Sequence, residues 1–481
     1  MSFHRLGRLA ALAVCSIFLP LWMSGAAEAL PVGNGLSQPS GEAGCISADQ
    51  PDCAEAPQSW FDLSRGIAVG ANRVLVASGN GDRVVSLDRN QATGALTASN
   101  DAGDCVAVHP VPDCQDGHDL GSPADIELDK SGKFAYAVAS KADSLITFKW
   151  VGGKLTQLAE AGCSAFRGDD FNDGSCQEGG VSMIRARDVA LSPDQQNIYV
   201  AAEGGGGENQ PEAINVFSRN VSTGTIGKLP GTAGCHSSNG QAGCEDADGI
   251  IGLRQIEVSP DGGNLYALSS ESDAITTFAR GAGGAITQKT NNVAYCVSAD
   301  GSDGDCVKVP QLEWANSMYL SRDGRSIYIS AVRQNGFNEP PSGALVHLRR
   351  DPATGKLSKP AIGPLCWGDL SGCSPAFGRF GGQAVESPDG RSLYVSGVVG
   401  ITAYSRDTNG VIVPLKGEGS CLFEAPFVAG CSKARIVSFY PELELSPAAD
   451  RLYTLGISAQ GLEAIGNLKR HSVVIGGLAG Q

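Results

Sequence analysis

The segment Ser387-Pro388-Asp389-Gly390-Arg391-Ser392-Leu393-Tyr394-Val395 joins a tight turn to an apolar strand. Proline fixes φ, aspartate can bond to its own backbone and glycine accepts positive φ, so the first four residues predict a hairpin turn. Related segments recur along the chain, and most carry a tyrosine at the place of Tyr394. The equivalent positions lie 59 to 67 residues apart and are Leu75, in a first copy with a shorter turn, then Tyr136, Tyr199, Tyr266, Tyr328, Tyr394 and Tyr453.

This long repeat predicts the fold class. Each copy continues into an apolar third strand, such as residues 274–278, then a turn such as residues 351–356, and then a fourth strand. Hydrophobic residues recur with a period close to two residues, which is typical of strands. A four-stranded unit of this length buries both faces of its sheet only between neighbouring units, as in a propeller ring. We therefore expect an all-β, seven-bladed β-propeller that occupies residues 30–481 as one domain.

The cysteines follow the same repeat. Fourteen of the fifteen form seven close pairs, one pair for each copy, and these pairs enclose short and mostly polar stretches. The pairs are Cys45 and Cys53, Cys105 and Cys114, Cys163 and Cys176, Cys235 and Cys244, Cys296 and Cys306, Cys366 and Cys373, and Cys421 and Cys431. Zinc ligation is the alternative, but it favours C-x-x-C spacing with histidine partners. The pattern predicts one disulfide-closed hairpin in each blade.

The two ends of the chain complement each other. The seventh copy stops near Gln481 without reaching a cysteine pair, whereas residues 40–45 resemble the approach to other cysteine loops, such as residues 160–163. We expect the 45–53 hairpin to complete the seventh blade. Closing the ring in this way removes an exposed sheet edge.

The first 29 residues have the features of a secretory signal peptide. Arg5 and Arg8 precede an apolar run over residues 9–23, and the small-residue ending at residues 27–29 predicts cleavage before Leu30. Lipidation at Cys15 is an alternative that would need an unusual cleavage site. No later segment approaches the roughly 20 apolar residues of a transmembrane helix. We expect a secreted or periplasmic protein, because disulfides persist in oxidising compartments.

The charge balance narrows the choice of partners. With 36 Lys+Arg against 51 Asp+Glu, the chain has a formal net charge of −15. A partner with a phosphate backbone, such as a nucleic acid, is therefore not expected. The remaining partner classes are a small anionic ligand and an extracellular protein.

The Ser-Pro-Asp-Gly-x-x-Leu-Tyr-Val pattern, with its following apolar strand and Thr-Gly-x-Leu turn, resembles the secreted, lactonase-like seven-bladed β-propellers of bacteria. The resemblance covers nearly the whole chain after residue 29, but it is carried by turn and core residues. Relatives in this broad group include sugar-lactone hydrolases, muconate-cyclising enzymes and proteins with no established activity. The resemblance therefore implies a fold and leaves the reaction open.

Two variable positions mark a candidate site. Alignment on the turn places Arg65, Ala124, Arg187, Arg254, Asn316, Gly382 and Pro441 at one equivalent position. It places Gly66, Asp125, Asp188, Gln255, Ser317, Gln383 and Glu442 at the next. These positions begin the first strands, at an end of the central channel that commonly carries propeller ligands. The candidate ligand-binding residues are Arg65, Asp125, Arg187, Asp188, Arg254, Gln255 and Glu442.

Two interpretations of these residues remain open. Arginines can hold a carboxylate bidentately and a carboxylate can activate water, so the site suits a sugar acid or its lactone. Alternatively, the same residues form ion pairs and caps within the ring. No histidine aligns there, and no Gly-x-Ser-x-Gly elbow is present. A binding or scaffold module is the preferred function, with a hydrolase of sugar-acid lactones or similar esters as the alternative.

Two acidic loops raise the possibility of calcium as a cofactor. Asp169 and Asp173 lie in one loop, and Asp300, Asp303 and Asp305 lie in another. Carboxylate oxygens in glycine-containing loops suit calcium, but neither loop completes an EF-hand with its terminal glutamate. Solvated turns are the alternative.

Overall fold

The computed structural model describes residues 34–57, 60–99, 102–108, 111, 114–166, 174–207, 209–333, 342–376, 380–398, 400–416, 419–424, 431–437, 441–457 and 463–472. These belong to a compact unit, residues 32–481, which is built from seven β-sheets. The predicted signal peptide, Asp169 and Asp173 lie outside the described residues. In the described part of the chain, no helix has the length and apolarity needed to cross a membrane.

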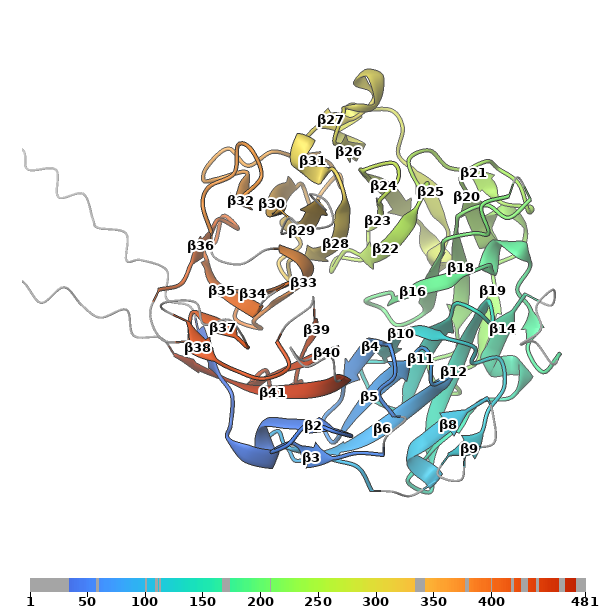
Figure 1. Cartoon of the computed structure of the whole chain (residues 1–481). Coiled ribbons are helices and arrows are strands. Elements are labelled where there is room, and N and C mark those ends of the chain that lie inside the picture. The colour runs from blue at the N-terminus through green and yellow to red at the C-terminus, as the bar shows by residue number, and fades with distance from the viewer. Residues whose placement is uncertain are drawn as a thin grey trace, which may run out of the picture. The chain divides into compact units, whose positions relative to one another are not determined.

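Each sheet is a blade whose first three strands are antiparallel neighbours, as the repeat predicts. The inner strands are β4 (Ser64–Val69), β10 (Pro123–Leu128), β16 (Ala186–Leu191), β22 (Leu253–Val258), β28 (Ala315–Leu320), β33 (Phe380–Glu386) and β39 (Glu442–Leu445). The second strands are β5 (Arg73–Ser78), β11 (Phe134–Ala139), β17 (Asn197–Ala202), β23 (Asn264–Ser269), β29 (Ser326–Arg333), β34 (Ser392–Gly397) and β40 (Arg451–Ile457). The third strands are β6 (Arg83–Arg89), β12 (Ser144–Val151), β18 (Ala213–Arg219), β24 (Ala274–Arg280), β30 (Ser342–Arg350), β35 (Gly400–Arg406) and β41 (Glu463–Ser472). We number the blades 1 to 7 in this order, and the inner strands surround the centre of the ring (Figure 1).

Each third strand also pairs with a short outer strand that begins at the first cysteine of a pair. These outer strands are β2 (Cys45–Ser47), β8 (Cys105–Ala107), β14 (Cys163–Ala165), β20 (Cys235–Ser237), β26 (Cys296–Ser298), β32 (Cys366–Gly368) and β37 (Cys421–Phe423). In most blades a second short strand extends the third strand's hairpin: β7 (Leu96–Thr97), β13 (Lys154–Gln157), β19 (Ile226–Lys228), β25 (Ile286–Gln288), β31 (Leu357–Ser358) and β36 (Ile412–Pro414). The helical segments are 3-10 turns: η1 (Gly41–Gly44), η2 (Ala102–Asp104), η3 (Glu160–Gly162), η4 (Val181–Met183), η5 (Gly231–Gly234), η6 (Ala282–Gly284), η7 (Val293–Tyr295), η8 (Ser302–Gly304) and η9 (Pro310–Leu312).

All seven predicted disulfides are present, one in each blade, with Cα–Cα distances of 4.5–5.0 Å. In chain order they join Cys45 to Cys53, Cys105 to Cys114, Cys163 to Cys176, Cys235 to Cys244, Cys296 to Cys306, Cys366 to Cys373, and Cys421 to Cys431. The predicted pairing of these fourteen cysteines is therefore confirmed.

The loop that each disulfide closes differs from the predicted hairpin in one respect. The chain returns from the loop parallel to the outer strand, whereas an ordinary hairpin returns antiparallel. The returning strands are β3 (Ala54–Glu55), β9 (Gln115–Asp116), β15 (Gln177–Glu178), β21 (Glu245–Asp246), β27 (Val307–Lys308) and β38 (Ser432–Lys433). In blade 5, a bridge from Trp367 to Ser374 takes the place of this strand.

Blade 7 combines the two ends of the chain. Strand β2 pairs with the C-terminal β41, with Cys45 opposite Gly466, and β1 (Asn34–Ser37) pairs with β41 further along. In Figure 1, β2 and β3 lie beside β41 at the junction of the first and last parts of the colour scale. The ring is therefore closed by hydrogen bonds between segments more than 400 residues apart in sequence.

The blades are joined by apolar clusters and by a repeated polar contact. A cluster between blades 1 and 2, for example, contains Leu75 and Val84 from one and Ala135 and Ile146 from the other, all fully buried. In six interfaces, a tyrosine on the second strand of one blade accepts a hydrogen bond from an arginine of the next blade. The donor is the arginine Nε, and the arginine lies at or near the end of the third strand. The pairs are Tyr136–Arg219, Tyr199–Arg280, Tyr266–Arg350, Tyr328–Arg406, Tyr394–Arg470 and Tyr453–Arg89, at 2.5–2.9 Å.

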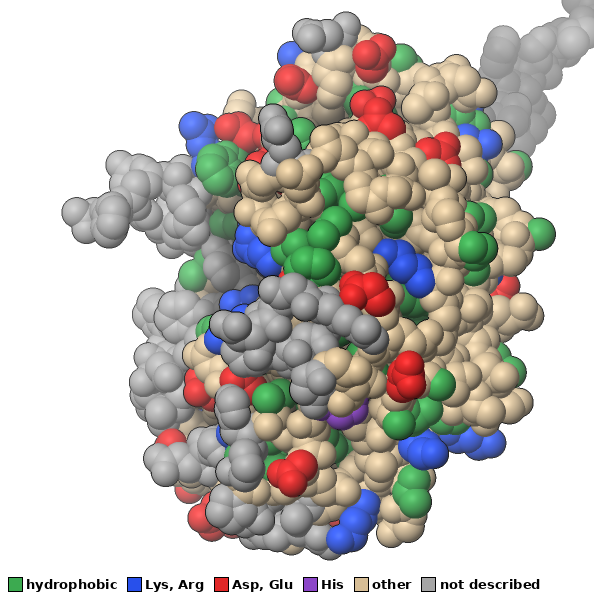
Figure 2. Space-filling model, turned by 90° about the vertical axis from the view of Figure 1, so that its right-hand side faces the viewer, with side chains coloured by type: hydrophobic (Ala, Val, Ile, Leu, Met, Phe, Trp, Pro, Cys, Tyr) green, Lys and Arg blue, Asp and Glu red, His purple; other side chains and the backbone are tan. Residues whose placement is uncertain are grey.

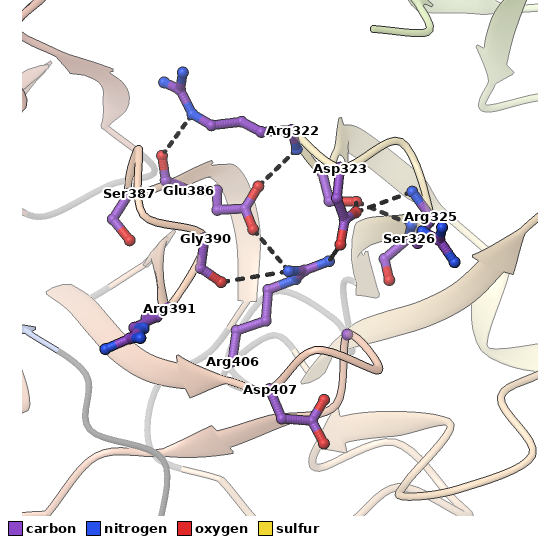
Figure 3. Close-up of polar contacts among 12 residues, drawn as sticks. Arg322, Asp323, Arg325, Ser326, Glu386, Ser387, Gly390, Arg391, Arg406 and Asp407 are labelled. Atoms are coloured by element: carbon purple, nitrogen blue, oxygen red, sulfur yellow. Dashed lines mark hydrogen bonds and ion pairs between the residues drawn. The ribbon is translucent and has the colours of Figure 1, made fainter. Parts of the chain in front are cut away.

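We call this tyrosine–arginine contact the interblade pin. In most cases it is extended by the turn aspartate of the tyrosine's own blade: Arg350 lies 2.8 Å from Asp261, and Arg406 lies 2.8 Å from Asp323. Figure 3 shows Arg406 between Asp323 of blade 5 and Glu386 of its own blade. In five interfaces the tyrosine hydroxyl also donates to a glycine carbonyl in the next blade; Tyr266, for example, donates to Gly355 at 2.9 Å.

Candidate functional site

The inner strands form two connected parts of a central channel. A mouth cavity of about 490 Å³ lies where the inner strands begin, and a channel cavity of about 670 Å³ extends along them. All seven candidate residues line the mouth cavity: Arg65, Asp125, Arg187, Asp188, Arg254, Gln255 and Glu442. They meet because equivalent positions in a ring of repeats lie at similar distances from its axis. Whether this cavity binds a ligand stays a prediction.

Arginines dominate one side of the mouth. The side chain of Arg187 is 31% exposed and binds Glu203, which also forms a 2.8 Å ion pair with Arg185. Arg254 donates from Nε to Ser270 at 2.9 Å, and its pKa is lowered by burial and by the nearby charge of Arg187. Because these cations crowd one another, an anion in the cavity would relieve their repulsion.

The sequence alignment missed two of these participants. Arg185 comes just before the aligned ring, and Glu203 follows β17, so neither occupies a position that the turn-based alignment compared. Arg185 precedes β16 and has a positive φ of 58°, and the strand pairing is irregular between Ala186 and Asp188, so the period of a strand does not predict its place beside Arg187. Glu203 carries no sequence signal either.

The carboxylates of the site also connect the blades. Asp125 Oδ2 accepts from the backbone N–H of Val189 at 3.0 Å, and Asp188 Oδ2 accepts from Ile256 at 2.8 Å. Gln255 Oε1 accepts from Met318 at 2.8 Å in the same manner. Each side chain thus caps an inner-strand N–H of the following blade. This structural role exists with or without a ligand.

A second layer of acids lies deeper in the channel. Glu127 accepts from Leu191 at 2.7 Å and Glu257 accepts from Leu320 at 3.1 Å, two residues further along their strands than Asp125 and Gln255. Glu444 lines the same channel cavity, two residues beyond Glu442. The spacing follows the period of a strand, so both layers face the channel.

Burial raises the pKa values of these acids, because it disfavours the charged carboxylate. It raises the pKa of Asp125 to about 6, of Glu127 and Glu257 to about 8, and of Glu444 to about 7. The pKa values of Asp188 and Glu442 also lie well above their usual range, because burial and the neighbouring Asp125 carboxylate both oppose ionisation. The channel therefore gains negative charge as pH rises through 6 to 8, and near neutrality some of its acids can donate a proton.

The described histidines lie outside the mouth lining. Among the described residues that line the mouth cavity there is no histidine. His347 is buried, stacks on Tyr328 with 5.0 Å between ring centroids, and has its pKa lowered to about 3 by burial. His236 is buried against Phe278. These two rings serve packing, so general base catalysis at the mouth would depend on a carboxylate.

Of the two acidic loops proposed for calcium, only the one that contains Asp300 lies within the described residues. Asp300 Oδ1 accepts from the Ser302 N–H at 2.8 Å and from the Ser298 hydroxyl at 3.2 Å, which lowers its pKa. This aspartate therefore serves as a turn cap, and η8 contains Asp303 and is followed by Asp305. Calcium is neither supported nor excluded. A grouping of His118 with Cys163 and Cys176 is a histidine beside a disulfide, so its sulfurs are not available as thiolates.

Charge is dispersed over one side of the molecule. Figure 2 shows one side of the molecule, where acidic and basic side chains are scattered among polar and apolar ones. A concentrated group of arginines above half-buried acids is thus a feature of the channel mouth and not of this side of the surface.

Comparison with known proteins finds solved structures that are similar to this chain at low sequence identity. No family model and no curated protein sequence matches the chain. Among solved structures, it is similar to a candidate 6-phosphogluconolactonase from Bacteroides fragilis, with 16% identity over 75% of this chain and 84% of that one, and a TM-score of 0.48. It is also similar to a periplasmic gluconolactonase from Pseudomonas aeruginosa, with 14% identity over 84% of this chain and 99% of that one, and a TM-score of 0.46. A functionally unknown protein from Desulfotomaculum acetoxidans has 10% identity over 82% and 91% of the two chains, and a TM-score of 0.45. The architecture assigned to this chain rests on its own seven sheets.

Proposed function

We propose that this propeller is a binding module, acting in an oxidising extracellular or periplasmic compartment, which captures a small organic anion such as a sugar acid at the channel mouth. The observation that carries the proposal is the convergence of Arg65, Arg187 and Arg254 on one cavity. Guanidinium groups hold carboxylates through paired hydrogen bonds. The amide of Gln255 and the acids below can bind hydroxyl groups of the same ligand. Seven disulfides support the compartment.

Calorimetry with D-gluconate, D-galacturonate and neutral D-glucose tests the proposal. We expect at least one acid to bind and glucose not to bind, and we expect Arg187→Gln or Arg254→Gln to weaken the acid at least tenfold. Arg391→Gln, which changes an exposed arginine on a turn, is the matched control and should bind normally. Equal affinity in all variants, or no binding of any acid at 1 mM, would contradict the proposal.

A second candidate function is hydrolysis of a sugar-acid lactone. It is favoured by the pKa of Asp125, which lies near 6 in the cavity that contains Arg187. An ionised Asp125 could take a proton from water while the arginines stabilise the oxyanion and the product carboxylate. Turnover of D-glucono-1,5-lactone above the spontaneous rate, reduced at least a hundredfold by Asp125→Asn, would establish it. If the sugar acid binds but the lactone is not turned over above the spontaneous rate, the result supports the binding function and contradicts hydrolysis of this lactone.

A further inference from the structure

One of the seven blade interfaces is built differently from the others. Between blades 1 and 2, Leu75 occupies the tyrosine position and Trp150 occupies the arginine position. The turn of blade 1 is the short Gly70-Ala71-Asn72, which lacks the aspartate. The next blade's third-strand turn keeps a glycine, Gly153, at the equivalent place, but its carbonyl accepts from Arg73 Nη2 at 3.5 Å. The tyrosine, the arginine and the turn aspartate of the interblade pin are thus all replaced at the same interface.

These replacements coincide with a cavity of about 530 Å³. Its lining comes from the turn of blade 1, at Gly70 to Arg73, and from blade 2, including Leu128, Lys133 and Trp150. We call it the interface cavity. Gly70, Ala71, Leu128, Ser131 and Gly132 also line the channel cavity, so the two spaces adjoin. The interface cavity therefore lies beside the channel cavity, at the interface that lacks a tyrosine–arginine contact.

Trp150 supplies the first indication of a ligand. Its ring is half-buried and packs against the apolar cluster of blades 1 and 2. Within the described part of the chain, its Nε1 is buried and has no hydrogen-bond acceptor. Because this nitrogen is buried, the part of the half-buried side chain that lines the interface cavity is the flat, apolar carbon surface of the indole.

The charges around the cavity supply the second indication. Its ionisable lining residues are Arg73, Lys133 and Lys149, and no carboxylate is among the described residues that line it, although the protein's net charge is −15. Arg73 is already paired with Asp104 at 2.9 Å and with Asp88 at 3.2 Å. The two lysines are therefore the cations that can meet a ligand, with Lys133 exposed and Lys149 half-buried.

We propose that the interface cavity binds a small organic anion with a flat, apolar body, such as an aryl carboxylate. Its ring would pack on the indole of Trp150 and on Leu128, and its charge would lie near Lys133. Aromatic side chains stack on flat rings, and ammonium groups attract anions most strongly where water is partly excluded. This site is separate from the channel mouth and does not depend on the function proposed there.

The test uses 2-naphthoate as the probe and 2-naphthamide as its neutral counterpart. Binding is measured by calorimetry, and the indole N–H resonance of Trp150, assigned by its loss in Trp150→Leu, is followed by NMR. We expect 2-naphthoate to bind at least tenfold more tightly than the amide and to shift the Trp150 resonance. Trp150→Leu should weaken 2-naphthoate at least tenfold, and Lys133→Glu at least fivefold.

Two further variants distinguish this site from alternatives. Leu75→Tyr combined with Trp150→Arg rebuilds a tyrosine–arginine pair and fills the cavity, so a folded double variant should lose binding. Arg187→Gln at the mouth should bind 2-naphthoate normally. The exposed Lys133→Glu variant keeps the test decisive if the Trp150 variants fail to fold. Equal affinity for the acid and the amide, no effect of Lys133→Glu, or loss of binding in Arg187→Gln would overturn the proposal.

Discussion

The six pinned interfaces and the interface between blades 1 and 2 hold the same ring together by different means. At a pinned interface, Arg350 donates to Tyr266 at 2.6 Å and forms an ion pair with Asp261, so the polar contact crosses from blade to blade. Between blades 1 and 2, Leu75 joins an apolar cluster and Trp150 stands beside a cavity. The difference shows that the ring closes without a pin at one interface, where a cavity lies instead. The predictions below test how much each pinned contact contributes.

The largest effect should follow from breaking a pin. The side chain of Arg350 is fully buried, and it also donates to Asn264 at 2.8 Å and to the Gly324 carbonyl at 2.8 Å. Arg350→Leu leaves these acceptors without their partner. The Asp261 side chain is 39% exposed and can be solvated by water, so the main cost comes from the buried acceptors, at about 1–3 kcal/mol for each. Equilibrium denaturation with disulfides intact should show this loss. Arg325→Gln, at a nearby exposed arginine, should change stability by less than about 0.5 kcal/mol; equal effects of the two would refute the role of the pin.

The channel acids should make stability fall as pH rises. Burial raises the pKa of Glu257 to about 8, whereas an unfolded glutamate ionises near 4.5, so the folded state holds more protons between these values. One unit of pKa difference corresponds to about 1.4 kcal/mol, and we expect a total loss of at least about 3 kcal/mol between pH 5 and pH 8. Denaturation at several pH values measures it. Glu257→Gln keeps an acceptor for the Leu320 N–H and should flatten the profile; a stability that increases over this range would contradict the prediction.

The same acids should set the pH dependence of anion binding at the mouth. Below pH 6, Asp125 is protonated in part, and the arginines then dominate the local charge. As pH rises towards 8, ionisation of the channel acids opposes the ligand. We expect the affinity for a sugar acid to decrease about three- to tenfold from pH 5.5 to pH 8, measured by calorimetry. A flat profile would place the ligand away from these acids.

A smaller effect is expected from adding a pin where none exists. Leu75→Tyr with Trp150→Arg restores the tyrosine and arginine but not the turn aspartate. A buried hydrogen bond to a charged group is worth about 1.5–3 kcal/mol, and the lost apolar contacts of Leu75 offset much of this. We expect a net change within about 1 kcal/mol of the parent in denaturation experiments. A loss greater than about 3 kcal/mol would show that this interface requires its apolar residues.

The smallest change in stability should come from the mouth. Arg254 is half-buried and donates to the Ser270 hydroxyl, while repulsion from Arg187 opposes its charge. Arg254→Gln removes one cation from a crowded group, so stability should stay within about 0.5 kcal/mol of the parent. Thermal denaturation checks this alongside the binding measurement. A marked destabilisation would indicate that Arg254 is part of the ring's framework.

Much of the fold follows from short, repeated segments. The turn and the tyrosine strand mark seven units, and the cysteines mark the outer strand of each, because both signals are local and return in every blade. The returning strands after the cysteine loops were not predicted as parallel, since two residues such as Gln115–Asp116 are too short to show a period. Local patterns predict the blades better than they predict such small elements.

The interblade pin escaped the sequence argument for a different reason. Its partners, such as Tyr266 and Arg350, lie 84 residues apart and belong to different copies of the repeat. Alignment of the copies compares equivalent residues and does not pair one copy with the next. A usable signal was nevertheless present, because the arginine is replaced by Trp150 in the blade that follows Leu75. At the mouth, the alignment brought seven residues to one cavity, but Glu203 lies outside the aligned positions and was missed.

The joint construction of blade 7 has a consequence for how the chain matures. Strand β41 needs β2 from the opposite end of the polypeptide, so a chain still being synthesised, or one truncated before residue 463, has six complete sheets and one incomplete sheet. Such a chain leaves strand edges unpaired, which makes it a target for proteolysis and association until residues 463–472 are available. The ring thus matures only when two segments more than 400 residues apart have met.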